Sequence, residues 1–356
     1  MYQPQYTINH QVLKYIGTIE ASREVILNAP LLPAWERKFK EEALVRQVHH
    51  GTHLEGNELN ITEAAQVVAG EDVIGRPRDI QEVINFRNVL EYIGHLTGPE
   101  GAAAEGKTFD ATQELILKLH KLTTDRILPP EKTGVFRTTQ VVIKNSETGE
   151  VSFRPPPSVE VPFLIDALLE WINKDAYNTH PVLTSGIVHY EIARIHPFVD
   201  GNGRVARGMA TLVLYRAGYD IRRFFSLEEY YDKNAHGYYQ ALQSVTNKGG
   251  DLTDWLVYFT EGLAIELTRI KEKIKKLSID VHMKERMGGK QMYLTERQIK
   301  IIEHLQGAGF LQNQSFPTLF PMISEDTILR ELKELIDNGI IVKVGKTKGA
   351  RYVLKS

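Results

Sequence analysis

Signals that begin and end α-helices recur along most of this chain of 356 residues, and they constrain its fold more than its composition does. A capping residue followed three positions later by Glu or Gln precedes three apolar runs, at Asn60–Glu63, Asp110–Gln113 and Ser226–Glu229. Helical spacing of apolar residues predicts further helices at 36–55, 181–195, 204–217 and 253–287. Gly56 and Gly70 follow two predicted helices where a left-handed cap is needed. We therefore predict a mainly α fold.

Two stretches add β-structure to this pattern. Residues 134–155 alternate β-branched and polar residues around a turn at Asn145–Gly149, which predicts a β-hairpin. Residues 291–356 combine two amphipathic helices, a turn and two short alternating stretches, an order that resembles a winged helix-turn-helix. We expect an N-terminal helical region at 1–105, a central domain at 106–287, a hinge at 287–290 and the terminal unit at 291–356.

The composition excludes several classes of protein. The chain has no cysteine, so it holds no disulfide, no thiolate zinc site and no cysteine nucleophile. Its 43 Lys and Arg nearly balance 45 Asp and Glu, and a net charge of −2 gives no overall attraction to nucleic acid or anionic membranes. The first ten residues lack the parts of a signal peptide, and no stretch approaches the ~18 apolar residues of a membrane span. We expect a soluble protein in the cytoplasm.

Residues 196–207, with the sequence HPFVDGNGRVAR, concentrate groups suited to phosphate chemistry. They join two predicted helices, and the glycines lead into the second one. Such a turn gathers backbone N–H groups at the positive end of the helix dipole, which favours a phosphate. Arg204 and Arg207 add cationic forks on one face of that helix. Asp200 offers a hard oxygen ligand for Mg²⁺, and His196 offers a base with a pKa near ~6.5.

Each of these residues also has an ordinary structural interpretation. Glycines more often serve turns than ligands, a single histidine or aspartate can pack or cap, and paired arginines usually face solvent or pair with acids. A zinc site on His196 and Asp200 is a chemical alternative, but the string holds no third ligand. Because all these groups occur within residues 196–207, we favour a nucleotide site.

The string resembles, without a mismatch, the HPFx(D/E)GNGRxxR signature of Fic-domain proteins. Most members of that family transfer AMP from ATP to a hydroxyl side chain of a protein. The resemblance extends to the FRTTQVVI part of the hairpin, the PPP segment after it and the HYEIARIHPF approach, and it covers residues 40–290. It implies a Fic-type helical bundle with a hairpin flap, and it makes the central domain a protein adenylyltransferase.

Residue by residue, the resemblance implies a role for each part of the signature. His196 is the general base for the incoming hydroxyl, and Asp200 holds Mg²⁺ between the α- and β-phosphates of ATP. The signature residues that bind ATP are Gly201, Asn202 and Gly203, which form an anion hole, and Arg204, Val205, Ala206 and Arg207. Gly203 indicates the AMP-transferring form, because relatives that phosphorylate proteins have lysine there.

The resemblance also implies ATP-binding residues outside the signature. Tyr238 and Tyr239 resemble tyrosines that flank adenine in relatives, and Asn247 supports them; core packing explains these aromatics equally well. Val141, Val142 and Ile143 complete the predicted set, and their strand offers its edge to the backbone of a target protein.

Upstream, the segment His53–Asn57 resembles the inhibitory motif (S/T)xxxE(G/N) of one Fic class. In that class the glutamate pairs with the last arginine of the signature, here Arg207, and displaces the γ-phosphate. Glu55 is therefore expected to line the ATP site and to inhibit it, although an ordinary surface glutamate is the alternative. Gly51 replaces the Ser/Thr of the motif, with Thr52 one place later, so we expect leakier inhibition. In some relatives the same glutamate positions water that removes AMP, and this second activity stays open.

Other functions also remain open on the sequence. A nucleotide-sensing DNA-binding regulator would use the basic residues at 340–356, but the acidic second helix of the terminal unit opposes that and favours protein docking or dimerisation. A scaffold with a dead site would lack a signature residue, and none is missing. UTP or another nucleotide could replace ATP. The resemblance implies a protein substrate with a Ser, Thr or Tyr acceptor, self-modification and a homodimer, without a membrane partner.

Overall fold

The computed structural model describes residues 2–29, 31, 33–98, 110–144, 151–277, 294–345 and 350–355. Two compact units can be distinguished: Met1–Glu24 with Glu41–Ile270, and Val25–Lys40 with Lys271–Ser356. The boundary crosses the three helices α1 (His10–Asn28), α2 (Pro33–His53) and α12 (Thr253–Leu277). The predicted boundaries near 105 and at 287–291 lie outside the described residues, so the division into three regions stays a prediction.

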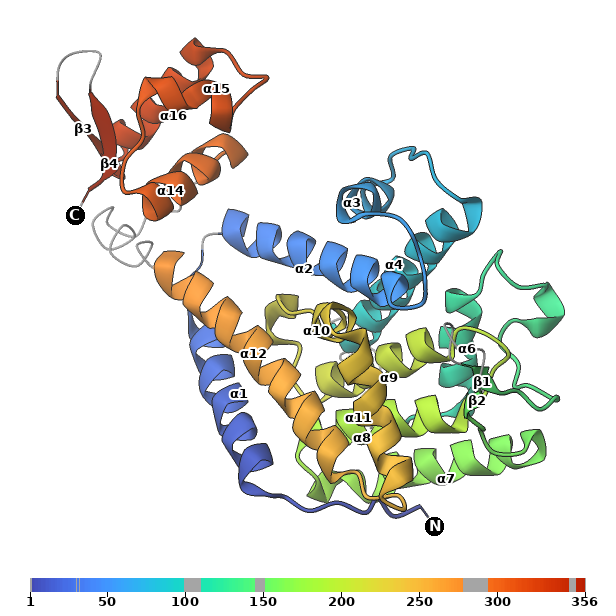
Figure 1. Ribbon diagram of the computed structural model, residues 1–356. Coiled ribbons are helices and arrows are strands. Elements are labelled where there is room, and N and C mark those ends of the chain that lie inside the picture. The colour runs from blue at the N-terminus through green and yellow to red at the C-terminus, as the bar shows by residue number, and fades with distance from the viewer. Residues whose placement is uncertain are drawn as a thin grey trace. The chain divides into compact units, whose positions relative to one another are not determined.

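The first unit consists mainly of helices (Figure 1). Besides parts of α1, α2 and α12, it holds α3 (Ile61–Ala69), α4 (Pro77–Thr97), α6 (Gln113–Thr123), α7 (Val161–Lys174), α8 (Pro181–Ile195), α9 (Asn202–Arg216), α10 (Leu227–Lys233) and α11 (Ala235–Asn247). Short 3-10 turns occur at Pro130–Lys132, Ser158–Glu160, Ala176–Asn178 and Ile221–Arg223. The predicted mainly α fold is confirmed. No helix among the described residues has the length and apolar character needed to span a bilayer.

The helices α8 and α9 form the centre of this unit, because both are buried on almost every side. Ser185 joins them by donating to the carbonyl oxygen of Ala210 at 2.8 Å. The next residue of α8 contacts α12, because the indole of Trp255 donates to the carbonyl oxygen of Gly186 at 2.7 Å. The loop between α8 and α9, which carries the signature, therefore connects two rigidly packed elements.

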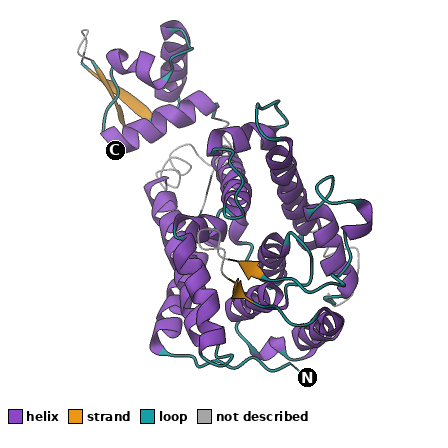
Figure 2. Cartoon of the chain, turned by 45° about the vertical axis from the view of Figure 1, so that its right-hand side comes forward, coloured by secondary structure: helices purple, strands orange, loops and turns teal. Residues whose placement is uncertain are grey.

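The hairpin is present but shorter than its sequence pattern predicted. Strands β1 (Ile143–Lys144) and β2 (Val151–Phe153) form a short antiparallel pair (Figure 2). Their register is irregular between the two partner pairs. Residues 134–142 do not join the ladder, since the backbone N–H of Arg137 instead donates to Pro197 at 2.8 Å. The predicted turn at 145–149 lies outside the described residues.

Several predicted helix ends are confirmed. Asn60 and Glu63 form a reciprocal capping box at the start of α3, and Gly70 ends that helix with φ of 84°. The hydroxyl of Ser226 accepts from the backbone N–H of Glu229 and caps α10. These ends depend on contacts within one helical turn, which is why the sequence alone identifies them.

Two other predicted ends are wrong. The helix predicted to start at Asp110 begins instead at Gln113, because the hydroxyl of Thr112 accepts from the N–H of Leu115 at 3.3 Å and takes the cap position. The helix predicted to run to residue 55 ends at His53, where the chain tightens into a turn before a left-handed Gly56 with φ of 90°. The predicted end of the long C-terminal helix and the hinge lie outside the described residues.

The second unit follows the predicted order of elements at its C-terminal end. It contains α14 (Glu296–Ala308), α15 (Phe316–Leu319), α16 (Glu325–Asp337) and the antiparallel strands β3 (Ile341–Val344) and β4 (Arg351–Leu354). Glu331 on α16 is 4% exposed, and its carboxylate accepts from Arg297 at 2.8 Å and from Thr295 at 2.9 Å. The carboxylate of Glu331 therefore stabilises packing within the unit.

Candidate active site

The loop between α8 and α9 is shaped by two residues in the left-handed conformation. His196 ends α8 with φ of 51°, and Gly201 precedes α9 with φ of 79°. The side chain of Asn202 closes the loop, because its oxygen accepts from the N–H of Phe198 at 2.8 Å and its nitrogen donates to the carbonyl of Phe198 at 2.9 Å. The side chain of Asn202 thus stabilises the loop and does not cap α9. The first backbone N–H groups of α9 can therefore bind an anion.

Arg137 holds this loop through backbone carbonyl groups. Its guanidinium donates to His196 at 2.8 Å and to Pro156 at 2.5 Å, and the residue is only 3% exposed. A left-handed conformation away from glycine costs ~1–3 kcal/mol, and these bonds offset that cost at His196. Arg137 is not among the predicted site residues, because its partners lie 19 and 59 positions further along the chain.

His120 on α6 supports the loop from another side. Its ring stacks on Phe198 with 3.7 Å between the ring centroids. Nδ1 accepts from the N–H of Gly134 at 2.9 Å, so Nε2 carries the proton and donates to the carbonyl oxygen of Asp200 at 3.1 Å. Burial lowers the pKa of His120 to about 4, and the ring is therefore neutral at pH 7. No local sequence pattern indicates this contact, which joins residues 80 positions apart.

His196 has the protonation state of a general base. Its Nδ1 lies 3.4 Å from the carbonyl oxygen of Ala193, which can only accept, so Nδ1 carries the proton and Nε2 keeps a free lone pair. Burial lowers the pKa of His196 below its ordinary value, although the nearby charges of Glu55 and Asp200 act in the opposite direction. The imidazole is therefore neutral at pH 7, as proton abstraction requires.

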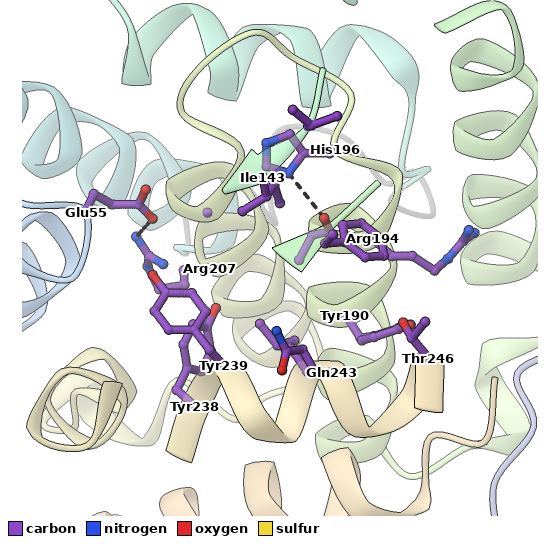
Figure 3. A pocket seen from close by; sticks show the side chains of 15 residues that line it. Glu55, Ile143, Tyr190, Arg194, His196, Arg207, Tyr238, Tyr239, Gln243 and Thr246 are labelled. Carbon is purple, nitrogen blue, oxygen red and sulfur yellow. Dashed lines mark hydrogen bonds and ion pairs between the residues drawn. The ribbon is translucent and has the colours of Figure 1, made fainter. Parts of the chain in front are cut away.

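Glu55 and Arg207 form the ion pair that the sequence motif implied. Oε1 of Glu55 lies 2.8 Å from Nη2 of Arg207, whose side chain is 1% exposed (Figure 3). Burial raises the pKa of Glu55, but the positive charges of Arg207 and Arg204 outweigh this effect and hold that pKa below its usual value. Glu55 is thus ionised at pH 7 and neutralises the guanidinium that the signature directs into the site.

Gly203 makes room for the carboxylate of Glu55. A Cβ at position 203 would clash with Oε1 of Glu55 and would approach Nη1 of Arg207 to 3.1 Å. The carboxylate therefore lies against the first turn of α9, where backbone N–H groups and the helix dipole favour negative charge. Glu55 occupies a position that suits an anionic ligand.

Packing against α4 requires a glycine at position 51, and the backbone carbonyl of Gly51 binds Arg207. A Cβ at Gly51 would clash with the ring of Phe86 on α4. The carbonyl of Gly51 accepts from Nη2 of Arg207 at 2.8 Å, whereas the hydroxyl of Thr52 donates to Val48 at 3.0 Å within α2. Thr52 thus does not replace the missing Ser/Thr of the motif, and the expected leakiness of the inhibition stays a prediction.

Residues of the signature and the segment around Glu55 line one pocket of about 360 Å³. The predicted site residues in its wall are Glu55, Val142, Ile143, His196, Gly203, Arg207, Tyr238 and Tyr239. The other wall residues were not predicted from the sequence; they are Phe153, Tyr190, Ala193, Arg194, Leu242, Gln243 and Thr246. The volume is in the range of ~300–1,000 Å³ that is usual for small-molecule sites.

Some predicted ATP-binding residues do not line this pocket. Val205 and Ala206 belong to α9 and are fully buried in the core. Val141 precedes β1, Asn247 ends α11, and neither belongs to the pocket wall. Gly201 shapes the approach to α9 by its left-handed backbone.

One face of α11 lines the pocket beyond the ion pair. Tyr239, Gln243 and Thr246 are spaced as neighbours on one side of a helix, and Figure 3 shows Gln243 and Thr246 progressively further from Glu55. Tyr238 is 2% exposed, and its hydroxyl bonds to Nε2 of His189 at 2.9 Å, so it is largely a core residue. The i, i+4, i+7 spacing from Tyr239 was the signal that could have found Gln243 and Thr246.

Asp200 and Arg204 belong to a charged network with α4. Arg204 is 1% exposed and lies 3.3 Å from both Oε1 of Glu82 and Oδ1 of Asp200. Oδ2 of Asp200 accepts from Arg78 at 2.7 Å. Burial raises the pKa of Asp200, but Arg204 and Arg78 hold it below its ordinary value. Within the described ranges no three His, Asp or Glu side chains lie close enough together to hold a metal ion.

The site thus combines a neutral histidine with a turn suited to an anion. Comparisons with known proteins show which family this part of the chain resembles. Residues 110–214 match the Fic/DOC family, and this range contains the whole signature. Residues 110–214 are therefore similar to the Fic domain.

Curated relatives extend the similarity beyond this domain. "Protein adenylyltransferase Fic" of Culex quinquefasciatus is 26% identical over 248 residues, which are 68% of this chain and 45% of that protein. The protein of the same name from Drosophila grimshawi is 30% identical over 186 residues, 51% of this chain and 35% of that protein. The chain thus spans less than half the length of these relatives.

Two solved structures share the fold. A Fic family protein from Desulfovibrio desulfuricans is similar with a TM-score of 0.66 and 24% identity, over 99% of this chain and 98% of that one. Fic-1 from C. elegans is similar with a TM-score of 0.60 and 24% identity, over 74% of this chain and 73% of that one. The predicted Fic-type helical bundle is confirmed.

Proposed function

We propose that this chain is a protein adenylyltransferase that transfers AMP from ATP to a Ser, Thr or Tyr hydroxyl of a protein and releases pyrophosphate. One observation carries the proposal: a neutral histidine, the glycine-rich start of a helix and a buried arginine line a single pocket. The names of the curated relatives support the same reaction.

In the proposed reaction, Nε2 of His196 takes the proton of the acceptor hydroxyl while the oxygen attacks the α-phosphorus. A bond forms from that oxygen to phosphorus, and the bond from the α-phosphorus to its bridging oxygen breaks, so pyrophosphate leaves with the electron pair. The N–H groups at the start of α9, together with Arg204 and Arg207, stabilise the charge on the phosphates. Arg137 and His120 hold the loop in place beforehand, so the reaction needs little reorganisation.

Asp200 is the residue that would hold Mg²⁺. A single carboxylate is enough when phosphate oxygens and water complete the octahedral shell, and this arrangement is common at nucleotide sites. Nε of Arg204 is buried and has no hydrogen-bond partner among the described residues, which fits a further anionic group nearby. When bound, the ion would neutralise charge on the α- and β-phosphates.

We also propose that Glu55 inhibits the enzyme. Its carboxylate lies on the first turn of α9 and pairs with Arg207, so it takes both the position and the cation that the γ-phosphate needs. ATP would then bind in a pose unsuited to in-line attack. A homodimer and self-modification stay predictions from the family resemblance.

Mass spectrometry of the purified full chain with ATP, Mg²⁺ and a cell lysate tests the activity. We expect addition of AMP to protein by the Glu55→Gly variant, and none by Glu55→Gly/His196→Ala. Binding of a fluorescent ATP analogue should be similar in both variants, which shows that the second substitution leaves the site folded. Equal AMP addition with and without His196 would refute its role as the base, and transfer of phosphate or of another nucleotide would refute the proposed reaction.

A further inference from the structure

Arg78 is bound to the carboxylate that would receive the metal ion, and the proposed function assigns it no role. It lies in the first turn of α4, and Nη2 donates to Oδ2 of Asp200 at 2.7 Å. Nε of the same guanidinium donates to Oε1 of Glu82 at 3.1 Å. The contact joins residues 122 positions apart, so it is a tertiary feature of the site.

The two oxygens of Asp200 have different surroundings. Oδ1 accepts from the backbone N–H of Gly201 at 2.6 Å and lies 3.3 Å from Arg204, whose side chain is 1% exposed. Oδ2 is held by Arg78, whose side chain is 59% exposed, while that of Asp200 is 30% exposed. The partners of Oδ1 are thus fixed in the fold, whereas the partner of Oδ2 is a long side chain on the surface that can leave at little cost.

We propose that Arg78 is an exchangeable cation on Asp200, which Mg²⁺ displaces when it binds with the nucleotide. A guanidinium and a metal ion on the same carboxylate oxygen repel each other, so they compete for Oδ2. Glu82 retains Arg78 after the exchange, because its side chain is 6% exposed and already accepts from Nε. This inference rests on the proposed function, since it requires Mg²⁺ at Asp200.

The exchange has a definite consequence for nucleotide binding. Without Mg²⁺, Arg78 neutralises Asp200 and keeps its negative charge from repelling the phosphates. Removal of Arg78 should therefore weaken binding of metal-free nucleotide. It should also make Mg²⁺ more effective, because the ion no longer competes with a guanidinium.

Equilibrium binding of a fluorescent ATP analogue to the full chain tests this competition. The variants are Glu55→Gly, Glu55→Gly/Arg78→Ala and, as a matched control, Glu55→Gly/Arg76→Ala. Arg76 also lies at the start of α4 and is exposed, but it pairs with Asp79 at 2.8 Å and with Glu58 at 3.1 Å and not with Asp200. Each protein is titrated with Mg²⁺ at one nucleotide concentration, so complex formation in solution is the same for all three.

We expect Arg78→Ala to lower the Mg²⁺ concentration at half-maximal tightening by about two- to fivefold, the range of an exposed ion pair. It should also raise the Kd measured in EDTA, while Arg76→Ala changes neither value. An Mg²⁺ midpoint equal to that of the control would overturn the competition. If Mg²⁺ has no effect on binding by any of the three proteins, the metal assignment of Asp200 fails, and the inference falls with it for that separate reason.

Discussion

At the scale of single residues, the site is organised around negative charge at the start of α9. Glu55 is ionised because Arg207 and Arg204 outweigh the effect of its burial on its pKa. The carboxylate of Glu55 can occupy this position only because residue 203 is glycine, since any larger residue would displace it. The same features that accept the side chain of Glu55 also suit a phosphate, so the carboxylate of Glu55 and the γ-phosphate of ATP would compete for one position.

Replacing Glu55 with glycine should therefore release the site. We expect Glu55→Gly to raise the rate of AMP transfer by about tenfold or more, within the range usual for regulatory coupling. Incorporation of labelled AMP into the chain itself, followed over time, measures the effect. Glu58→Gly is the control, because Glu58 is 72% exposed and pairs with Arg76 rather than Arg207. A rate that does not rise, or a rise equal to that of the control, would contradict the inhibitory role.

The protonation state of His196 gives a prediction for pH dependence. The neutral form is the active one, and burial lowers the pKa of His196 below the ordinary value of 6.5. Activity should therefore persist as the pH falls through 6.5 and decline only at lower pH, where the imidazole becomes protonated. The pH profile of kcat/KM for the Glu55→Gly variant, with MgATP as the varied substrate, reports this group in the free enzyme. A decline centred above 6.5 would contradict the assignment.

At the scale of elements, the end of α2 is held against α10. Oδ2 of Asp232 lies 2.7 Å from Nδ1 of His50, and Oδ1 lies 2.8 Å from Nδ1 of His53. The two histidines are three positions apart and so share one face of α2. The side chain of Asp232 is 9% exposed, and it binds the last turn of α2, just before Glu55. The position of Glu55 thus depends on a contact outside the pocket.

Loosening this contact should weaken the inhibition without touching the chemistry. We expect Asp232→Ala to raise AMP transfer by about two- to fivefold, less than Glu55→Gly, because Arg207 still attracts Glu55. In the double variant Asp232→Ala/Glu55→Gly the rate should equal that of Glu55→Gly alone. Asp254→Ala is the control, since Asp254 pairs with Lys248, whose side chain is 54% exposed. A further gain in the double variant would show that Asp232 acts by another route.

Among the elements, the features that depend on neighbouring residues could be predicted from the sequence. Helix ends and the spacing of the signature are set within a few residues, so the capping box of α3 and the position of the anion-binding turn followed from the sequence. Arg137 and His120 did not, because each meets the loop across a long stretch of chain. Asn247 was selected by resemblance, while Gln243 and Thr246 face the pocket because they follow Tyr239 at helical spacing.

At the scale of the whole molecule, one unit supplies every described group of the candidate site. The pocket draws on the end of α2, the hairpin and the helices α8, α9 and α11, all within Glu41–Ile270. A ligand that joins so many elements should stabilise the folded state through linkage. Thermal unfolding of the full chain can therefore report nucleotide binding independently of catalysis.

We expect MgATP at 100 times its Kd to add ~2.7 kcal/mol of stability to the unit that binds it in the Glu55→Gly variant, and to raise its Tm by about 5–11 °C. Glu55→Gly/His196→Ala should keep this shift, because His196 acts on the acceptor hydroxyl and not on the phosphates. Glu55→Gly/Gly203→Ala should lose it, because the new Cβ fills the space in which the carboxylate, and by inference a phosphate, lies. Alanine in a helix costs less than glycine, so without ligand this variant should unfold at no lower temperature. Differential scanning calorimetry measures both effects, and a full nucleotide shift in the Gly203→Ala variant would show that ATP does not bind at the start of α9.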